Sequence, residues 1–310
     1  MNAILIIDKP AGLTSHDVVN RVRRILQERS VGHLGTLDPL ATGVLPLVVG
    51  SLTRLAQFYT SSEKTYEGTI RFGFATDTYD AEGEPTSPAQ EVVLSLEQLR
   101  ELASRFRGRI EQTPPPFSAK KIKGVPAYKL ARKHAEVTLR PVQVEVKEFE
   151  ITAIGAHVGP DALVQQGSVA SFRARVASGT YMRSIAHDMG QLISCGAHLA
   201  SLRRTSVGEF DLADAHTLEE LDATVKTGSD EYIFIHPRKL LPQFPSVTAN
   251  EEMAARIRTG RPVNLPELSQ AKMVKVFAGQ RELIAIATRV AGTLFHAKIV
   301  LAAESGRVIA

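Results

Sequence analysis

One stretch, Gly32 to Leu45, restricts what this chain can fold into more than any other. It places a single carboxylate, Asp38, between a glycine-rich approach and Pro39. Glycine and proline there favour a shaped loop over a helix interior or a central strand. An acid in such a loop is a candidate for chemistry, although an Asp-Pro pair taken alone more often only starts a turn. The rest of the stretch decides between the two interpretations.

The full stretch, GHLGTLDPLATGVL, closely resembles the catalytic loop of the TruB family of tRNA pseudouridine-55 synthases. In that family the aspartate of Gly-Thr-Leu-Asp-Pro-Leu-Ala-Thr-Gly is the catalytic residue, which implies that Asp38 is catalytic here. The resemblance covers about Ile4 to Gly208. It implies the α+β pseudouridine synthase fold, which is a mixed, largely antiparallel sheet with flanking helices.

Further segments resemble motifs of the same family. Taken alone, a tyrosine in a strand is more often a core residue, and an arginine in the first turn of a helix is more often a surface residue. The Lys-x-Tyr motif implies that Tyr66 stacks on the target base. The Gly-Thr-Tyr-x-Arg motif implies that Arg183 pairs with the catalytic aspartate and that Tyr181 lines the pocket. Leu202 matches the leucine that packs against the flipped base.

Five other residues are candidates for substrate binding. Lys9, in Asp-Lys-Pro-x-Gly-x-Thr-Ser, either supports the active site or is a surface lysine at a turn. His33 either fills the gap left by the extruded nucleotide or holds a neighbouring phosphate. Asp80 lies in an acidic turn that lacks the ligand spacing of a calcium loop, and we expect it to meet base edges or protein donors. Arg203 and Arg204 are expected to add positive charge beside the cleft.

Positive charge is concentrated in one part of the chain. The formal net charge is +4, but from Arg100 to Arg140 there are eleven Lys or Arg against three Glu. This excess indicates either a polyanionic partner such as RNA or a solvated basic face. A Pro-Pro-x-x-Ser-Ala-x-Lys start resembles the RNA-clasping insertion of the family, here about residues 113–135. The basic residues expected to bind RNA are Lys120, Lys121, Lys123 and Arg132. The usual glycine of the closing Ala-Arg-x-Gly is replaced by His134.

Hydrophobic periodicity predicts both strands and helices. Expected strands are Ile4 to Ile7, Gly43 to Val49, Lys64 to Phe74, Pro141 to Ile154, Ser168 to Ala177 and the end of Gly196 to Gly208. Expected helices begin at Thr14 or Ser15, span Leu52 to Tyr59 and Leu96 to Phe106, and run from the Arg183 motif toward Cys195.

The chain is long enough for two domains, since 310 residues exceed the usual size of one. A stretch with three prolines, from about His236 to Pro245, is the expected boundary. We therefore predict a catalytic domain over 1–238 and a small β-rich domain over 239–310. Beyond the boundary we expect a helix over Glu251 to Arg258 and strands over Lys272 to Phe277, Leu283 to Thr288 and Leu294 to Val300. This part resembles PUA-like RNA-binding domains.

Several classes of protein are disfavoured. Cys195 is the only cysteine, which excludes an intrachain disulfide and a cysteine-based metal cluster. The apolar run at the N-terminus covers about five residues, too few for a signal sequence or a spanning helix. Neither a P-loop nor a dinucleotide fingerprint is present. We expect a cytoplasmic monomer without membrane contact, bound metal or cofactor.

The resemblance implies an enzyme that isomerises uridine to pseudouridine at position 55 in the T loop of tRNA. Asp38 is then the nucleophile or base that acts on a flipped-out nucleotide. Attack at C1′ of the sugar, attack at C6 of the base and a glycal route all fit these residues. Two alternatives are a guide-dependent RNA pseudouridine synthase and a tRNA-folding protein that binds RNA without catalysis.

Overall fold

A computed structural model of the chain describes residues 1–118, 120–122, 124–131, 139–158, 164–228 and 230–302. In these residues a ten-stranded sheet has the order β12-β1-β3-β10-β4-β9-β8-β5, with β2 added to β3 and β11 to β10. Its strands are β1 (Ala3–Lys9), β2 (Val31–His33), β3 (Thr42–Val49), β4 (Lys64–Phe72), β5 (Gly108–Gln112), β8 (Val142–Val158), β9 (Val164–Val176), β10 (Ala197–Val207), β11 (Phe210–Asp211) and β12 (Ala215–His216).

Most neighbouring strands of this sheet are antiparallel. The parallel pairs are β1 with β12 and β3 with β10. The sheet is therefore mixed and largely antiparallel, which confirms the predicted fold class. Because β10 lies between β3 and β4, it brings the residues after Ala197 next to both the Asp38 loop and the Tyr66 strand.

Each face of the sheet has its own hydrophobic core. Side chains alternate along a strand, so Leu5 and Ile7 of β1 join one core whereas Ile4 and Ile6 join the other. The first core includes apolar residues of helices α1 (Ser15–Leu26), α3 (Leu96–Ser104), α5 (Met182–Leu192) and α6 (Leu218–Thr227). The second includes residues of the 3-10 helix η1 (Gly50–Leu55) and of α2 (Ala56–Tyr59).

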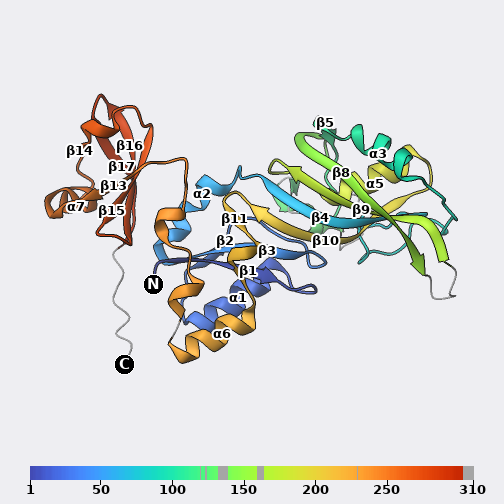
Figure 1. Cartoon of the computed structure of the whole chain (residues 1–310), viewed down its shortest axis with the longest axis horizontal. Helices are drawn as coiled ribbons and strands as arrows, with labels where there is room; N and C mark the ends of the chain where they lie inside the picture. The colour runs from blue at the N-terminus through green and yellow to red at the C-terminus, as the bar shows by residue number, and fades with distance from the viewer. Residues whose placement is uncertain (119, 123, 132–138, 159–163, 229, 303–310) are drawn as a thin grey trace.

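A second sheet follows at the C-terminal end and lies at one end of the long axis (Figure 1). It has the order β13-β15-β16-β17-β14 and is covered by helix α7 (Glu251–Arg258). Its strands are β13 (Ser246–Ala249), β14 (Val263–Asn264), β15 (Met273–Ala278), β16 (Glu282–Ala291) and β17 (Leu294–Val300). Phe277, Ile286 and Ile299 of this sheet belong to the same core as Ile4 and Ile6, so the two sheets are packed together.

A buried lysine reinforces that junction. Lys275 of β15 is 2% exposed, and its Nζ donates to the carbonyl oxygens of Arg238 (3.0 Å) and Leu240 (2.6 Å). Both carbonyls belong to the segment that leads into the second sheet. Burial lowers the pKa of this ammonium group.

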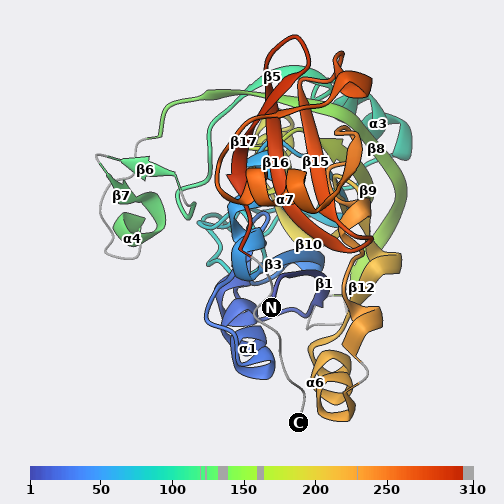
Figure 2. The same ribbon diagram turned by 90° about the vertical axis from the view of Figure 1, so that its left-hand side faces the viewer.

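The basic insertion stands out from the body of the molecule (Figure 2). Its described part contains a small hairpin and a short helix: β6 (Lys121–Ile122), β7 (Val125–Pro126) and α4 (Ala127–Ala131). Lys123 and Arg132, both predicted to bind RNA, lie outside the described residues.

Several predicted elements differ in detail. The helix expected over Leu52 to Tyr59 is a 3-10 helix followed by one α-helical turn. Strand β10 covers the whole of Ala197–Val207 rather than only its end. The strands expected over Pro141 to Ile154 and Ser168 to Ala177 extend further toward each other, because β8 reaches Val158 and β9 starts at Val164.

Candidate active site

The Asp38 loop connects β2 to β3, and its backbone is held by side chains from two distant segments. Lys9 Nζ donates to the carbonyl of Pro39 (3.1 Å) and to those of Pro10 and Leu13. Ser15 Oγ accepts from the amide of Leu37 (2.7 Å) and donates to its carbonyl (3.0 Å). The peptide groups on either side of Asp38 are thereby fixed.

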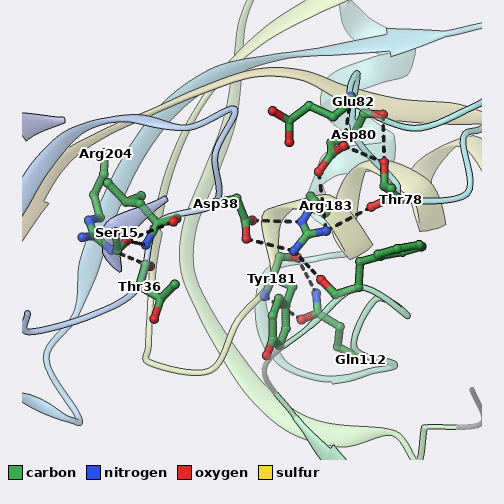
Figure 3. A network of polar contacts seen from close by, with 12 residues as sticks. Ser15, Thr36, Asp38, Thr78, Asp80, Glu82, Gln112, Tyr181, Arg183 and Arg204 are labelled. Carbon is green, nitrogen blue, oxygen red and sulfur yellow. Dashed lines mark hydrogen bonds and ion pairs between the residues drawn. The ribbon is translucent and has the colours of Figure 1, made fainter. Parts of the chain in front are cut away.

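Asp38 and Arg183 form a two-pronged ion pair (Figure 3). Arg183 Nη2 donates to Asp38 Oδ1 at 3.0 Å, and Nε lies 2.9 Å from Oδ2. The side chain of Asp38 is 36% exposed, whereas that of Arg183 is 6% exposed. The carboxylate therefore has a buried cation behind it and one side open to solvent. The predicted pairing is present.

Arg183 has further partners on the side away from Asp38. Its Nη1 donates to the carbonyl of Thr78 (3.1 Å) and lies 3.5 Å from Asp80 Oδ2. Asp80 is 3% exposed and also accepts from the hydroxyl of Thr78 (2.6 Å) and the amide of Glu82 (3.1 Å). Of the two predicted partners for Asp80, base edges and protein donors, the structure shows protein donors.

The first turn of α5 positions Arg183. Tyr181 is the N-cap residue, and its main chain exchanges two hydrogen bonds with the side-chain amide of Gln112 (2.8 and 3.0 Å). A cation is unfavourable at the positive end of a helix dipole, and the two carboxylates beside Arg183 offset this. Arg183 Nη2 also donates to the carbonyl of Phe117 (3.0 Å), which links the site to the start of the basic insertion.

Two predicted base contacts come from neighbouring strands. Tyr66 of β4 and Leu202 of β10 are each 8% exposed and belong to the same core as Leu37. Tyr181 is half-buried, and burial, with a smaller effect of the Asp38 charge, raises the pKa of its hydroxyl. These three side chains lie on elements that border the Asp38 loop.

Lys9 is fully buried, so the interpretation of it as a surface lysine is wrong. It joins the Asp38 loop, through the carbonyl of Pro39, to the turn after β1, through the carbonyls of Pro10 and Leu13. Burial lowers the pKa of its ammonium group to about 8, while the nearby carboxylates of Glu82 and Asp38 oppose this shift. A direct substrate contact does not fit its complete burial.

The two adjacent arginines of β10 have different environments. Arg203 pairs with Asp8 through both of its terminal nitrogens (3.0 and 2.7 Å) and stays partly exposed. The sequence predicts that Arg204 adds charge beside the cleft, but this residue is 0% exposed. Its guanidinium donates to backbone carbonyls instead of facing solvent. Successive side chains of a strand point to opposite faces, which explains why only one of the pair is buried.

The remaining candidates lie at the edge of the site or in the insertion. His33 ends β2, is half-buried, and accepts a hydrogen bond from the amide of Gly35 at its Nδ1 (3.3 Å). Burial, followed by the charge of Arg204, lowers the pKa of this imidazole. Lys120 is exposed, and Lys121 lies in β6.

Sequence reasoning missed four contributors to the site: Ser15, Thr78, Gln112 and Phe117. Ser15 had a signal, because it belongs to the Thr-Ser end of the opening motif. Thr78 and Phe117 contribute backbone carbonyls to Arg183, which any residue type can supply.

The described residues contain neither a cluster of side chains that could hold a metal nor an apolar helix of membrane-spanning length. No group of three or more His, Cys, Asp or Glu side chains there is arranged to hold a metal ion. In the same part of the chain, no helix is long and apolar enough to cross a membrane.

Comparison with protein families agrees with this geometry. The family model "TruB family pseudouridylate synthase (N terminal domain)" matches residues 23–182, and "tRNA pseudouridylate synthase B C-terminal domain" matches residues 183–241. The chain belongs to the TruB family. The two models together include Asp38, Tyr66 and Arg183.

TruB relatives match over nearly the whole chain. The chain is 50% identical to tRNA pseudouridine synthase B of Solibacter usitatus, over 97% of this chain and 100% of the relative. It is 39% identical to tRNA pseudouridine synthase B of Aquifex aeolicus, over 89% and 92%. These names describe an RNA pseudouridine synthase, which confirms the predicted enzyme class.

Solved structures agree on the fold. An H/ACA ribonucleoprotein bound to a substrate RNA contains a chain that matches with a TM-score of 0.69 at 22% identity, over 98% of this chain and 86% of that chain. A chain of a Cbf5-Nop10-Gar1 complex matches with a TM-score of 0.66 at 24% identity, over 94% and 79%. At these identities the likeness concerns the fold.

Proposed function

We propose that this chain isomerises the uridine at position 55 in the T loop of tRNA to pseudouridine, as a stand-alone enzyme that needs no cofactor. The observation that carries the proposal is the pair of Asp38 and Arg183, in which a half-open carboxylate is held by a buried guanidinium. This pair occurs in a chain that shares half of its residues with a tRNA pseudouridine synthase B.

The reaction makes modest chemical demands. The bond from C1′ of the ribose to N1 of uracil breaks, and a bond from C1′ to C5 forms. The proton of C5 is lost, and N1 gains a proton, so no electrons are transferred and no group donor is consumed. One ionised carboxylate serves as nucleophile or base, provided that the detached uracil is held and water is kept out.

Asp38 is suited to this task by its surroundings. Arg183 contacts both carboxylate oxygens of Asp38, which orients the group. Because the loop backbone is also fixed by Lys9 and Ser15, little reorganisation is needed when a substrate arrives.

The base is held by the hydrophobic side of the site. In this proposal Tyr66 and Leu202 sandwich the uracil, and Tyr181 lines the pocket. Extruding the nucleotide costs roughly a few kcal/mol. His33 at the mouth fills the gap in the RNA or binds a phosphate, and the exposed Lys120 with its basic neighbours holds the backbone.

We also propose a division of labour along the chain. Residues 1–238 form the catalytic domain, with the RNA-clasping insertion at about 113–135, and residues 239–310 form a PUA-like RNA-binding domain. The separate five-stranded sheet supports this division, although it shares a core with the large sheet. We propose that the enzyme acts as a monomer in the cytoplasm.

Two RNAs of the same sequence test the proposal. The purified protein, with no guide RNA and no other protein, should form one pseudouridine in an isolated T-arm stem-loop. It should react far more slowly with the same sequence held as a full duplex, because flipping then loses pairing as well as stacking. Equal rates would contradict recognition of the loop, and a reaction that appears only with an added guide would favour the guide-dependent alternative.

A further inference from the structure

Arg204 is among the largest side chains that the fold buries completely, and it lies beside Ser15 and Thr36, on the other side of Asp38 from Arg183 (Figure 3). Its Nε donates to the carbonyl of Val44 (2.8 Å), Nη1 to that of Thr36 (3.2 Å) and Nη2 to that of Gly35 (3.0 Å). Gly35 and Thr36 precede Asp38, whereas Val44 follows it. One guanidinium therefore ties both arms of the loop together.

The backbone of Arg204 is pressed against the same loop. Arg204 pairs with Gly43 across β10 and β3. Gly43 has φ of +98°, and a Cβ there would lie 2.2 Å from the carbonyl oxygen of Arg204. Only glycine allows this approach. Side chain and main chain of one residue thus fix the return of the loop into β3.

We propose that Arg204 is a positioning residue for Asp38, which fixes the loop from beneath and contributes a buried positive charge to the site. This inference rests on the proposed role of Asp38. It replaces the substrate contact predicted for Arg204, because the guanidinium is turned away from solvent.

The charge of Arg204 acts on several neighbours. It lowers the pKa of His33, Lys9 and Lys64, each of which is lowered mainly by burial. Burial also lowers the pKa of Arg204 itself, and the charge of Asp38 is among the influences that oppose this. The charges of Arg204 and Asp38 are therefore close enough to interact.

Two substitutions separate geometry from charge. Arg204→Lys keeps the charge, but an ammonium is a point donor and cannot bridge carbonyls on both arms of the loop. Arg204→Met removes both. We expect each variant to lower kcat on tRNA at least tenfold while the Kd for tRNA stays within threefold. A larger loss of kcat in Arg204→Met than in Arg204→Lys measures the part of the effect that depends on the charge.

Lys275→Met is the matched control. It also removes a buried cation that caps two backbone carbonyls, but in the second sheet. We expect it to lower the melting temperature as Arg204→Met does, with kcat within twofold of wild type. Equal losses of kcat in both variants would show that Arg204 serves stability alone.

Folding does not limit the test. Should Arg204→Met fail to fold, Arg204→Lys is compared with wild type by hydrogen exchange of a peptide covering residues 35–44, together with kcat. Faster exchange with reduced kcat supports the inference, and unchanged exchange with unchanged kcat overturns it. Wild-type protein that makes no pseudouridine in tRNA would instead contradict the proposed function.

Discussion

Asp38 and Asp80 approach the same guanidinium from opposite sides, but the chain holds them in different ways (Figure 3). The side chain of Asp38 is 36% exposed and that of Asp80 is 4% exposed. The loop of Asp38 is fixed by side chains from β1, α1 and β10. The turn of Asp80 is fixed from within, by the hydroxyls of Thr76 and Thr78.

Under the proposed function, this difference separates a reacting group, Asp38, from an anchor, Asp80. A carboxylate that is open on one side can meet a substrate, and its loop needs support from outside because the open side offers none. A carboxylate that is closed on all sides can only hold Arg183. Because Arg183 pairs with both carboxylates, Asp80 helps to set the position of Arg183 and, through it, that of Asp38. Substitutions at these residues test this division, beginning with the largest expected effect.

Replacing Asp38 by Asn should lower kcat by about 10³ or more, because the amide removes the nucleophile or base. Affinity for tRNA should stay within a few-fold, since the change removes few RNA contacts. Single-turnover formation of pseudouridine and a filter-binding titration measure the two quantities. Substantial turnover by this variant would place the chemistry on another residue.

Replacing Arg183 by Lys should lower kcat by about 10²-fold, because an ammonium cannot match the planar fork that meets both oxygens of Asp38. The bonds to the carbonyls of Thr78 and Phe117 are weakened as well. Arg175→Lys is the control, since Arg175 of β9 pairs with two carboxylates at the surface, those of Glu63 and Glu148. Wild-type kcat in Arg183→Lys would mean that the pair seen here is not used in the reaction.

Replacing Asp80 by Asn should lower kcat by about tenfold, less than either change above, because the anchor acts only through Arg183. The amide nitrogen of the new side chain can then face Arg183 Nη1. Both groups are hydrogen-bond donors, so the contact is lost. Asp77→Asn in the same turn is the matched control, because Asp77 is exposed and accepts only from the amide of Glu84 among the described contacts. A loss as large as that of Asp38→Asn would mean that Asp80 has a direct role in the reaction.

Much of the local structure follows from the sequence. Glu251–Arg258 and Leu294–Val300 have the predicted bounds, because amphipathic periodicity and flanking turn residues mark both ends. Helix α6 was missed, although Thr217 and Glu220 have the spacing of a capping box and form one. Strand β5 was also missed. It has five residues and little apolar alternation, so only its pairing with β8 in the folded chain makes it a strand.

The candidate site, too, could be predicted only in part from the sequence. The family motifs predict Asp38, Tyr66 and Arg183, but nothing local brings Arg183 to an aspartate 145 residues away. That approach depends on how β10 is inserted between β3 and β4. Alternation along a strand predicts that Arg203 and Arg204 point to opposite faces, but not which one is buried. The charge of both arginines led to the prediction that both lie at the surface. Arg204 is buried instead, because backbone carbonyls of the Asp38 loop accept its hydrogen bonds.

The smallest effect on chemistry is expected in the basic insertion. Neutralising Lys120, Lys121 and Lys123 to alanine should weaken binding of tRNA while kcat at saturating RNA stays near wild type. Lysines that bind phosphates release counterions, so the salt dependence of the association constant should flatten in this variant. On helical RNA the slope should fall by up to roughly 0.9 logarithmic units for each phosphate that is no longer neutralised. Lys226→Ala, which removes an exposed charge on α6, should leave the slope unchanged.

The insertion also contacts the pair of Asp38 and Arg183, because Arg183 donates to the carbonyl of Phe117. If the lysines only hold RNA, their removal raises KM and the salt slope falls, while single-turnover rates at saturation do not change. If RNA held by the insertion also sets the position of Phe117, kcat falls in the triple variant and stays low at saturation. A changed kcat with an unchanged salt slope would place the phosphate contacts elsewhere and leave the insertion acting on Arg183 alone.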